Sequence, residues 1–324
     1  MSMSIAPTET ITSLSLIPDV DEASSVHSEV DLLKASCIVQ QKSISITLDG
    51  TAVFIVSLGI ALAIHFLDSY LAEAFVCLIP VALLVHNDYH NFLSLGPGGT
   101  PSTIQGYIRI TYLRLLTLRD PFTAPLPDPN RDPKTGVLAG KHLPYRAGPR
   151  PVVAGIAPQR QLDQHGSRQC YIALRRAMER LSAKTPNKFG TERSCLEKHG
   201  LALFARHPLQ TNCQGEIAHV HDSDHSMHMS LHPHDIKEIL QKGWGQRHPL
   251  AWKNRFIQMP VSQDFVMVYA PRGKNFISVP QSSNFSYGVM LTVSADEMEL
   301  EIVGKIINAA IWYTLAEDVD INAK

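Results

Sequence analysis

The sequence has few cysteines and few charged residues for its length, and neither sign of charge dominates. Five cysteines in 324 residues are widely spaced and form no C-x-x-C pair. This spacing favours reduced thiols and indicates neither a disulfide framework nor a thiolate zinc site. Charged residues make up 18% of the chain and the formal net charge is −1, so no overall basic field would attract nucleic acid.

The sequence also shows no secretory signal and no internal repeat. Its first residues carry no positive charge and no apolar run follows them directly, so we expect no signal peptide there. Residues 1–48 are rich in serine and threonine with little apolar periodicity, which predicts a mobile tail with one short helix near Val30–Gln40. The apolar fraction of 44% excludes a mostly disordered protein.

Two apolar runs follow the tail and are separated by Asp68. Thr51–Leu67 carries no charge, and Ser69–Val85 carries one acid, Glu73. Each run lies at the lower limit of the roughly 17–25 residues that span a bilayer. We therefore expect residues 49–90 to anchor the chain in a membrane, as a helical hairpin or as one span plus an interfacial helix. A buried helical hairpin of a soluble protein is the alternative.

Residues 91–158 are rich in the turn formers glycine and proline, most densely in Gly96–Pro101 and Pro121–Pro133. We expect this region to connect the anchor to the next domain without a core of its own, and to contain one helix, Thr103–Leu118. Its basic residues weakly indicate, by the positive-inside tendency, that the following domain faces the cytosol. They are Arg109, Arg114 and Arg119.

Residues 159–324 are predicted to form the catalytic domain, of the α+β class. Apolar periodicity and capping residues predict three helices, Arg168–Lys184, Pro233–Lys242 and Ser294–Thr314. The predicted strands are Thr191–Glu197 with Leu201–Arg206, two strands within Gly215–Leu231, and Phe265–Ala270. No repeating βαβ unit connects them, so a small antiparallel sheet with packed helices is expected.

The histidines are concentrated in one part of the sequence. Nine of the fifteen histidines lie between His199 and His248, where even spacing over the chain would place about two. In the predicted hairpin, alternate residues of a strand share a face. His219, His221 and His228 therefore lie on one face of the hairpin. The apolar residues lie on the other: Ala218, Val220, Met227, Met229 and Leu231.

The register of this hairpin follows from keeping its apolar residues together. Pairing Val220 with Met229 achieves this and places His221 directly opposite His228. The loop is then Ser223–Ser226, a four-residue turn. Antiparallel neighbours lie about 5 Å apart, close enough for two imidazoles to share one ligand or proton.

Three interpretations of these histidines stay open. They are catalytic bases or donors in a pocket, since imidazole titrates near neutral pH. They bind a metal, for which a three-histidine set suits Zn²⁺. Or they form a solvated polar face. Glu216 would point away from them on a regular strand, so it would not complete a metal site.

Further polar residues follow in two short motifs. GWGQRHPLA contains Trp244, expected to be a packing anchor, and the neighbouring cation and imidazole Arg247 and His248. These two are either a surface pair or a clamp for an anion. VYAPR ends a strand with Tyr269 and Arg272, at a position where polar site residues are common.

Taken together, the order of these motifs resembles the fungal luciferase family. EIAHVHDSDHSMHMSL, GWGQRHPLA and FVMVYAPR occur in succession and are followed by a helix of about twenty residues. Upstream, NDYHNFLSLGPGGTPSTIQGY and APQRQ are also similar, so the resemblance extends from Leu83 to Lys324. This chain differs by a longer tail, an additional apolar run and an insertion-like stretch, Gly273–Val293.

The resemblance implies a membrane-associated enzyme that uses O₂ and no recognised flavin. The luminous member of the family oxygenates 3-hydroxyhispidin, a styryl α-pyrone. We expect this chain to act on a pyrone-like or polyketide-derived phenol in secondary metabolism, without any cofactor beyond O₂, with or without light. The expected catalytic residues are His219, His221, His228, Arg247 and His248. The expected substrate-binding residues are Glu216, Trp244, Tyr269 and Arg272.

In this hypothesis His219 or His221 is the base, His228 is its partner, and Arg247 and Arg272 hold the enolate and peroxide charges. In a variant of this hypothesis, His219, His221 and His228 bind a metal ion instead. Two alternatives do not involve oxygen: an isomerase, cyclase or decarboxylase acting on a similar substrate, and a non-catalytic binding module.

Overall fold

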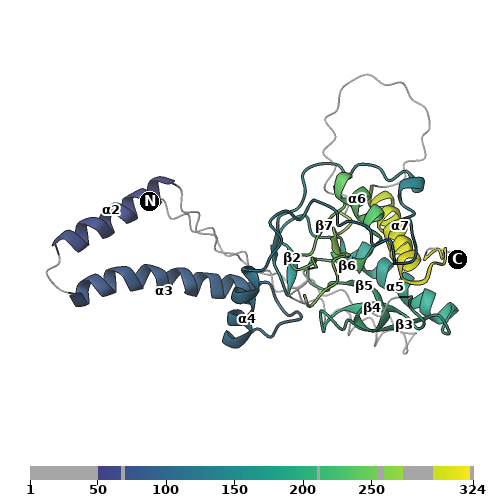
Figure 1. Cartoon of the computed structure of the whole chain (residues 1–324), viewed down its shortest axis with the longest axis horizontal. Coiled ribbons are helices and arrows are strands. Elements are labelled where there is room, and N and C mark those ends of the chain that lie inside the picture. Colours follow the sequence, from purple (N-terminus) through teal and green to yellow (C-terminus); the bar gives the residue numbers. More distant parts are fainter. Residues whose placement is uncertain (1–49, 67–69, 210–211, 254–258, 273–294, 322–324) are drawn as a thin grey trace, which may run out of the picture. The chain divides into compact units, whose positions relative to one another are not determined.

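The computed structural model describes residues 50–66, 70–209, 212–253, 259–272 and 295–321 (Figure 1). Helices and an antiparallel sheet share a core in the C-terminal part of the chain, which confirms the α+β prediction. The N-terminal tail with its short predicted helix, the turn at Asp68 and the insertion-like stretch Gly273–Val293 lie outside the described residues.

A six-stranded antiparallel sheet forms the centre of the C-terminal part. Its strand order is β3-β4-β5-β6-β8-β7, and β1 pairs with β2 in a separate small hairpin. The sheet strands are β3 (Phe189–Arg193), β4 (Leu201–Ala205), β5 (Glu216–Val220), β6 (Met227–Ser230), β7 (Gly245–Arg247) and β8 (Phe265–Val268). The small hairpin consists of β1 (Val153–Gly155) and β2 (Gln159–Gln161). Both predicted hairpins and the buried strand are thereby confirmed, whereas β7, β1 and β2 were not predicted.

Three helices accompany the sheet, at the predicted positions. They are α5 (Arg168–Lys184), α6 (Pro233–Gln241) and α7 (Ala295–Leu315). The Ser167 side chain caps α5 by accepting the Cys170 amide, and α6 begins with proline, whose missing N–H costs nothing in a first turn. Gly243, at φ +78°, closes the turn after α6, a backbone conformation that glycine adopts without steric cost.

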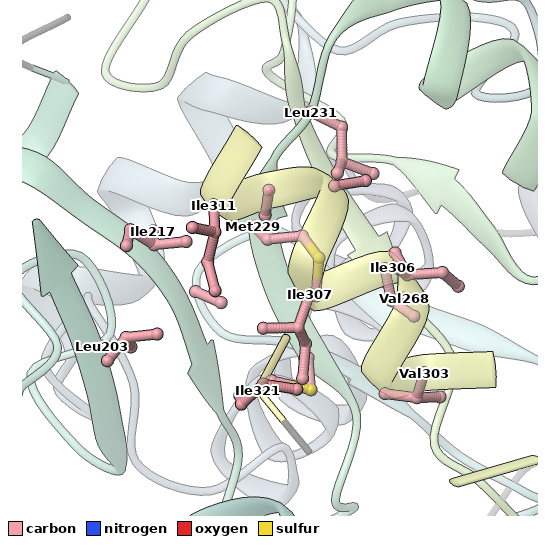
Figure 2. Close-up of a cluster of buried hydrophobic side chains, with 14 of the residues drawn as sticks. Leu203, Ile217, Met229, Leu231, Val268, Val303, Ile306, Ile307, Ile311 and Ile321 are labelled. Atoms are coloured by element: carbon pink, nitrogen blue, oxygen red, sulfur yellow. The ribbon is translucent and has the colours of Figure 1, made fainter. Parts of the chain in front are cut away.

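Helix α7 packs on the apolar face of the sheet (Figure 2). Its buried side chains meet residues of β4, β5, β6 and β8 in one continuous core. The helix side contributes Val303, Ile306, Ile307 and Ile311, and the sheet side contributes Leu203, Ile217, Met229 and Val268. The histidine side chains of β5 and β6 consequently lie on the opposite face of the sheet.

Truncating Ile307, which is fully buried in this core, should measurably destabilise the protein. Ile307→Ala is expected to lower the free energy of unfolding by about 2–5 kcal/mol, because it removes buried methyl groups and leaves a cavity. Met298→Ala on the same helix is the matched control, since Met298 is 49% exposed. Urea unfolding of both variants measures the difference; equal midpoints would contradict this packing.

The two apolar runs form helices α2 (Gly50–Phe66) and α3 (Tyr70–Ser94). In the described part of the chain, however, no helix is both long enough and apolar enough to cross a membrane, so the predicted transmembrane anchor is not supported. The 17 residues of α2 extend about 25 Å, short of a hydrocarbon core of about 30 Å. The 25 residues of α3 include a polar C-terminal stretch with His86, Asn87 and Asp88.

Helix α4 (Ile104–Arg114) is shorter than the predicted Thr103–Leu118. Thr103 is its N-cap and accepts the Gly106 amide, as its residue type favours. Asp88 of α3 joins α4 through Tyr107 and Arg114. Around this junction Phe92, Ile110, Ile156 and Leu250 form a second, smaller apolar cluster, which ties the connecting region to residues far along the chain.

Candidate active site

The histidine hairpin exists, but its register differs by two residues from the prediction. His219 pairs with His228, and Val220 pairs with Met227 rather than Met229. The reason is the turn: the His221 amide donates to Ser226 O at 2.9 Å, so the loop is Asp222–His225, with His225 at φ +62°. A shift of two residues preserves the side-chain alternation, so all three predicted histidines still share a face.

Glu216 also reaches this face, contrary to the expectation for a regular strand. A β-bulge interrupts the pairing of β5 with β4: Leu203 pairs with Ala218, but the next residue, Phe204, pairs with Glu216. Because Ile217 is the additional residue, the in–out alternation of side chains is reversed for the residue before it. Glu216 therefore lies on the same face as His219. The Glu216 carboxylate bonds His219 Nδ1 and also accepts the Ser194 hydroxyl at 2.9 Å and the Cys195 amide at 2.8 Å.

His221 and His228 form a pair within the cluster. His221 Nε2 lies 2.9 Å from His228 Nδ1. The other nitrogen of His221 lies 2.9 Å from Ser226 Oγ and 3.2 Å from Asp224 Oδ1. The other nitrogen of His228 lies 2.8 Å from Gln159 Oε1 on β2. Each imidazole is therefore oriented by an oxygen from a different part of the chain.

These groups are removed from solvent. His219, His221 and His228 are 1%, 1% and 3% exposed. Burial lowers the pKa of His221, and burial together with the neighbouring imidazoles places the pKa of His228 well below its usual value. Burial opposes ionisation of Glu216, but His219 and the hydrogen bonds to the carboxylate hold its pKa below the usual value. The surroundings therefore favour the neutral form of His221 and His228 and the ionised form of Glu216.

A buried ion pair lies beside the cluster. Arg160 on β2 and Glu197 in the loop before β4 bond each other, and their side chains are 6% and 7% exposed. The Arg160 charge lowers the pKa of both His221 and His228. Sequence reasoning did not identify Arg160, Gln159 or Glu197 as site residues. The APQRQ motif was the available signal, because it contains Gln159 and Arg160.

His248 adjoins the cluster but both of its ring nitrogens are bonded to backbone. Its ring centroid lies 5.6 Å from that of His228. Nε2 lies 2.8 Å from Ile156 O, and Nδ1 accepts the Leu250 amide at 3.1 Å. Burial lowers the pKa of His248 to about 4. The geometry suits a residue that holds the surrounding loops in place.

The other predicted site residues bond groups outside the cluster. Arg247 donates to the backbone oxygens of Thr123, Ala251 and Gln263. Arg272 forms an ion pair with Glu299 and donates to Ala147 O. The Trp244 indole donates to Pro144 O, and the Tyr269 hydroxyl donates to Gln246 Oε1. In these contacts the four side chains hold neighbouring segments of the chain in place. Their catalytic and substrate-binding roles stay predictions.

The expectation of reduced thiols fails at one pair. Cys195 and Cys213 form a disulfide across 18 residues, which the wide sequence spacing did not indicate. The bond joins the loop that follows β3 to the residues that enter β5. Cys195 also donates its amide to Glu216, so the disulfide holds the loop on which the orientation of Glu216 depends.

Buried imidazoles on one face of a sheet, each oriented by a hydrogen-bond acceptor, are typical of an enzyme centre, so the fold and the site define an α+β enzyme. The Luciferase domain family matches residues 214–275, which contain the histidine hairpin and the GWGQRHPLA motif. Luciferase of Neonothopanus nambi is 29% identical over 246 residues, covering 70% of this chain and 86% of that protein. Luciferase of Armillaria mellea is 30% identical over 227 residues, covering 63% and 82%.

The chain thus belongs to the family of fungal luciferases, as the order of its motifs predicted. Luciferase of Armillaria ostoyae is a further relative, 30% identical over 214 residues and covering 60% of this chain and 77% of that protein. No solved structure matches the chain.

Proposed function

We propose that this protein is a luciferase-type oxygenase that acts with O₂ on a pyrone-like or polyketide-derived phenolic substrate in fungal secondary metabolism. The relatives named luciferase support the reaction class. One structural observation carries the assignment of the centre. His219 is held at Nδ1 by the Glu216 carboxylate, and its buried Nε2 has no hydrogen-bond partner among the described residues.

The chemistry required of the protein is modest. An electron-rich enol can reduce O₂ once it is deprotonated, because the substrate itself supplies the electrons. If the cluster acts by itself, His219 Nε2 accepts that proton and Glu216 stabilises the imidazolium that forms. Within this proposal Arg160, rather than Arg247 or Arg272, stabilises the developing anion, since its charge acts on His228 and its Nε has no hydrogen-bond partner in the part of the chain that the structure describes.

The assignment is tested with the full chain and a hispidin-type 3-hydroxy-α-pyrone, by recording oxygen uptake and photon counts together. Uptake with light identifies a working luciferase, and uptake without light identifies an oxygenase that tailors a metabolite. Consumption of the pyrone without oxygen uptake would replace the proposal with an isomerase, cyclase or decarboxylase. Binding of the pyrone without any turnover would leave a non-catalytic binding module.

We also propose that the protein acts at a lipid membrane. The supporting observation is the row of exposed apolar side chains on α2 and α3, which suits an interfacial attachment. It includes Ile55, Phe66, Leu71, Phe75, Leu78 and Leu83.

The double variant Leu71→Asp/Phe75→Asp should release the protein from lipid. Each of these side chains is more than half exposed and contributes about 1.5–3 kcal/mol when buried in an apolar phase, so we expect at least about tenfold weaker co-sedimentation with phosphatidylcholine vesicles. Leu126→Asp is the control, because Leu126 is 85% exposed outside these helices. Equal sedimentation of all three proteins would refute the attachment.

A further inference from the structure

Three imidazole nitrogens, one from each histidine of the cluster, converge on the polar face of the sheet. One ring nitrogen from each of His219, His221 and His228 lies within 4.8 Å of those of the other two. The hydrogen bonds identify them as the inner nitrogens: His219 Nε2, His221 Nε2 and His228 Nδ1. His219 Nε2 is buried and unpartnered among the described residues.

The outer nitrogens of the same rings all face acceptors. His219 Nδ1 faces the Glu216 carboxylate, and His228 Nε2 lies 2.8 Å from the amide oxygen of Gln159. His221 Nδ1 faces Asp224 and Ser226, whose hydroxyl already donates to Asp224 at 2.8 Å. A carboxylate or amide oxygen can only accept, so each outer nitrogen carries its ring's hydrogen. The three inner nitrogens are therefore bare lone pairs.

This proton arrangement creates a conflict that a cation resolves. His221 Nε2 and His228 Nδ1 lie 2.9 Å apart, and two lone pairs at that distance repel. With the Gln159 amide oxygen facing His228, a bridging proton would turn one ring into an imidazolium, which full burial and the neighbouring Arg160 cation oppose. A metal ion accepts electron pairs from all three nitrogens at once and requires no change of tautomer.

We propose that His219, His221 and His228 bind one divalent first-row transition metal ion through these inner nitrogens. Metal-bound histidines typically donate their other ring N–H to a carboxylate or carbonyl oxygen, which is the pattern found here for all three rings. Tetrahedral coordination at about 2.0–2.1 Å places ligand nitrogens roughly 3.4 Å apart, within reach of small ring rotations. Three protein ligands leave one position open, the composition of a catalytic rather than a structural site.

The inference rests on the proposed function only in taking this cluster as the reaction centre. It changes the assignment of one residue, because Nε2 of His219 is then a ligand and no longer the proton acceptor. All-imidazole sites suit Fe²⁺, Co²⁺, Cu²⁺ and Zn²⁺, so the ligand set defines the class of ion and not its identity.

The test measures metal directly, independently of turnover. The full chain is purified without chelators and its metal content is determined by mass spectrometry. A chelator-stripped sample is then titrated with Co²⁺ while its visible absorption is recorded. We expect about one metal per chain and saturable Co²⁺ binding with the visible bands of a low-coordinate site.

Variants locate the site. His219→Ala, His221→Ala and His228→Ala are each expected to weaken Co²⁺ binding at least tenfold, and Glu216→Gln by about 10–100-fold through loss of the outer hydrogen bond. His225→Gln is the matched control: it is a buried histidine of the same hairpin, bonded to Gly166 O. Far-UV circular dichroism checks that each variant is folded. If an alanine variant does not fold, Glu216→Gln still tests the site.

The outcomes separate this inference from the proposed function. Oxygen uptake by protein that neither contains nor binds metal would overturn the metal site and leave the oxygenase intact. The cluster would then be a proton network in which the Gln159 amide is rotated to donate to His228. Undiminished binding by the triple alanine variant would also overturn it. Metal binding without oxygen uptake would support the site and count against the oxygenase.

Discussion

The His219→Ala variant is expected to consume O₂ with a 3-hydroxy-α-pyrone about 10²–10⁴-fold more slowly than the native chain, the usual contribution of a positioned acid–base group. The reason is local: Nε2 of His219 is buried and has no hydrogen-bond partner within the described ranges, so it is available to a proton or to a metal ion. His225→Gln should retain the native rate, since His225 lies in the turn of the same hairpin but bonds Gly166 O and stacks on Tyr171, outside the cluster. Initial rates from an oxygen electrode measure both variants.

Glu216 is expected to act through His219, so replacing it should also slow the reaction. Glu216→Gln preserves the size of the side chain but removes the charge that fixes the His219 tautomer, so kcat should fall while KM for the pyrone changes little. Glu216→Asp, which keeps the carboxylate, should recover part of the rate. If KM rose and kcat were unchanged, Glu216 would be a substrate-binding residue and the Glu216–His219 assignment would be wrong.

The largest effect on stability is expected at Glu197. Removing its carboxylate leaves the buried Arg160 without its ion-pair partner, and breaking a buried ion pair in this way costs about 3–5 kcal/mol. Glu197→Ala should therefore unfold at clearly lower urea concentration than the native chain. Glu192→Ala is the control, because Glu192 is exposed on β3 and such substitutions change stability by less than about 0.5 kcal/mol.

A paired replacement separates the structural from the chemical role of Arg160. Arg160→Met/Glu197→Leu exchanges both charges for apolar groups of similar size, and such exchanges are often neutral or stabilising. We expect stability near the native value but a lower rate of oxygen uptake, because the cation beside the cluster is gone. Native activity in this double variant would exclude Arg160 from charge stabilisation.

The predictions that the structure confirms rest mostly on the spacing of apolar residues within short segments. The period of the apolar residues was sufficient for α5, whose observed bounds match the prediction. The alternation within GEIAHVH and MHMSL was sufficient to place His219, His221 and His228 on one face, because side-chain alternation survives a register shift of two residues. The apolar runs predicted helices α2 and α3, but a run of apolar letters does not show whether a helix spans a bilayer.

By itself, then, the sequence determined the helices and the longer strands, the histidine-bearing face and, through its ordered motifs, the family. Only the tertiary structure decided what surrounds those histidines. The bulge at Ile217 that turns in Glu216, the Cys195–Cys213 disulfide and the oxygens of Gln159 and Asp224 depend on contacts between distant segments. No local period records such contacts, because which segments meet depends on burial and hydrogen bonding over the whole domain and not on neighbouring residues.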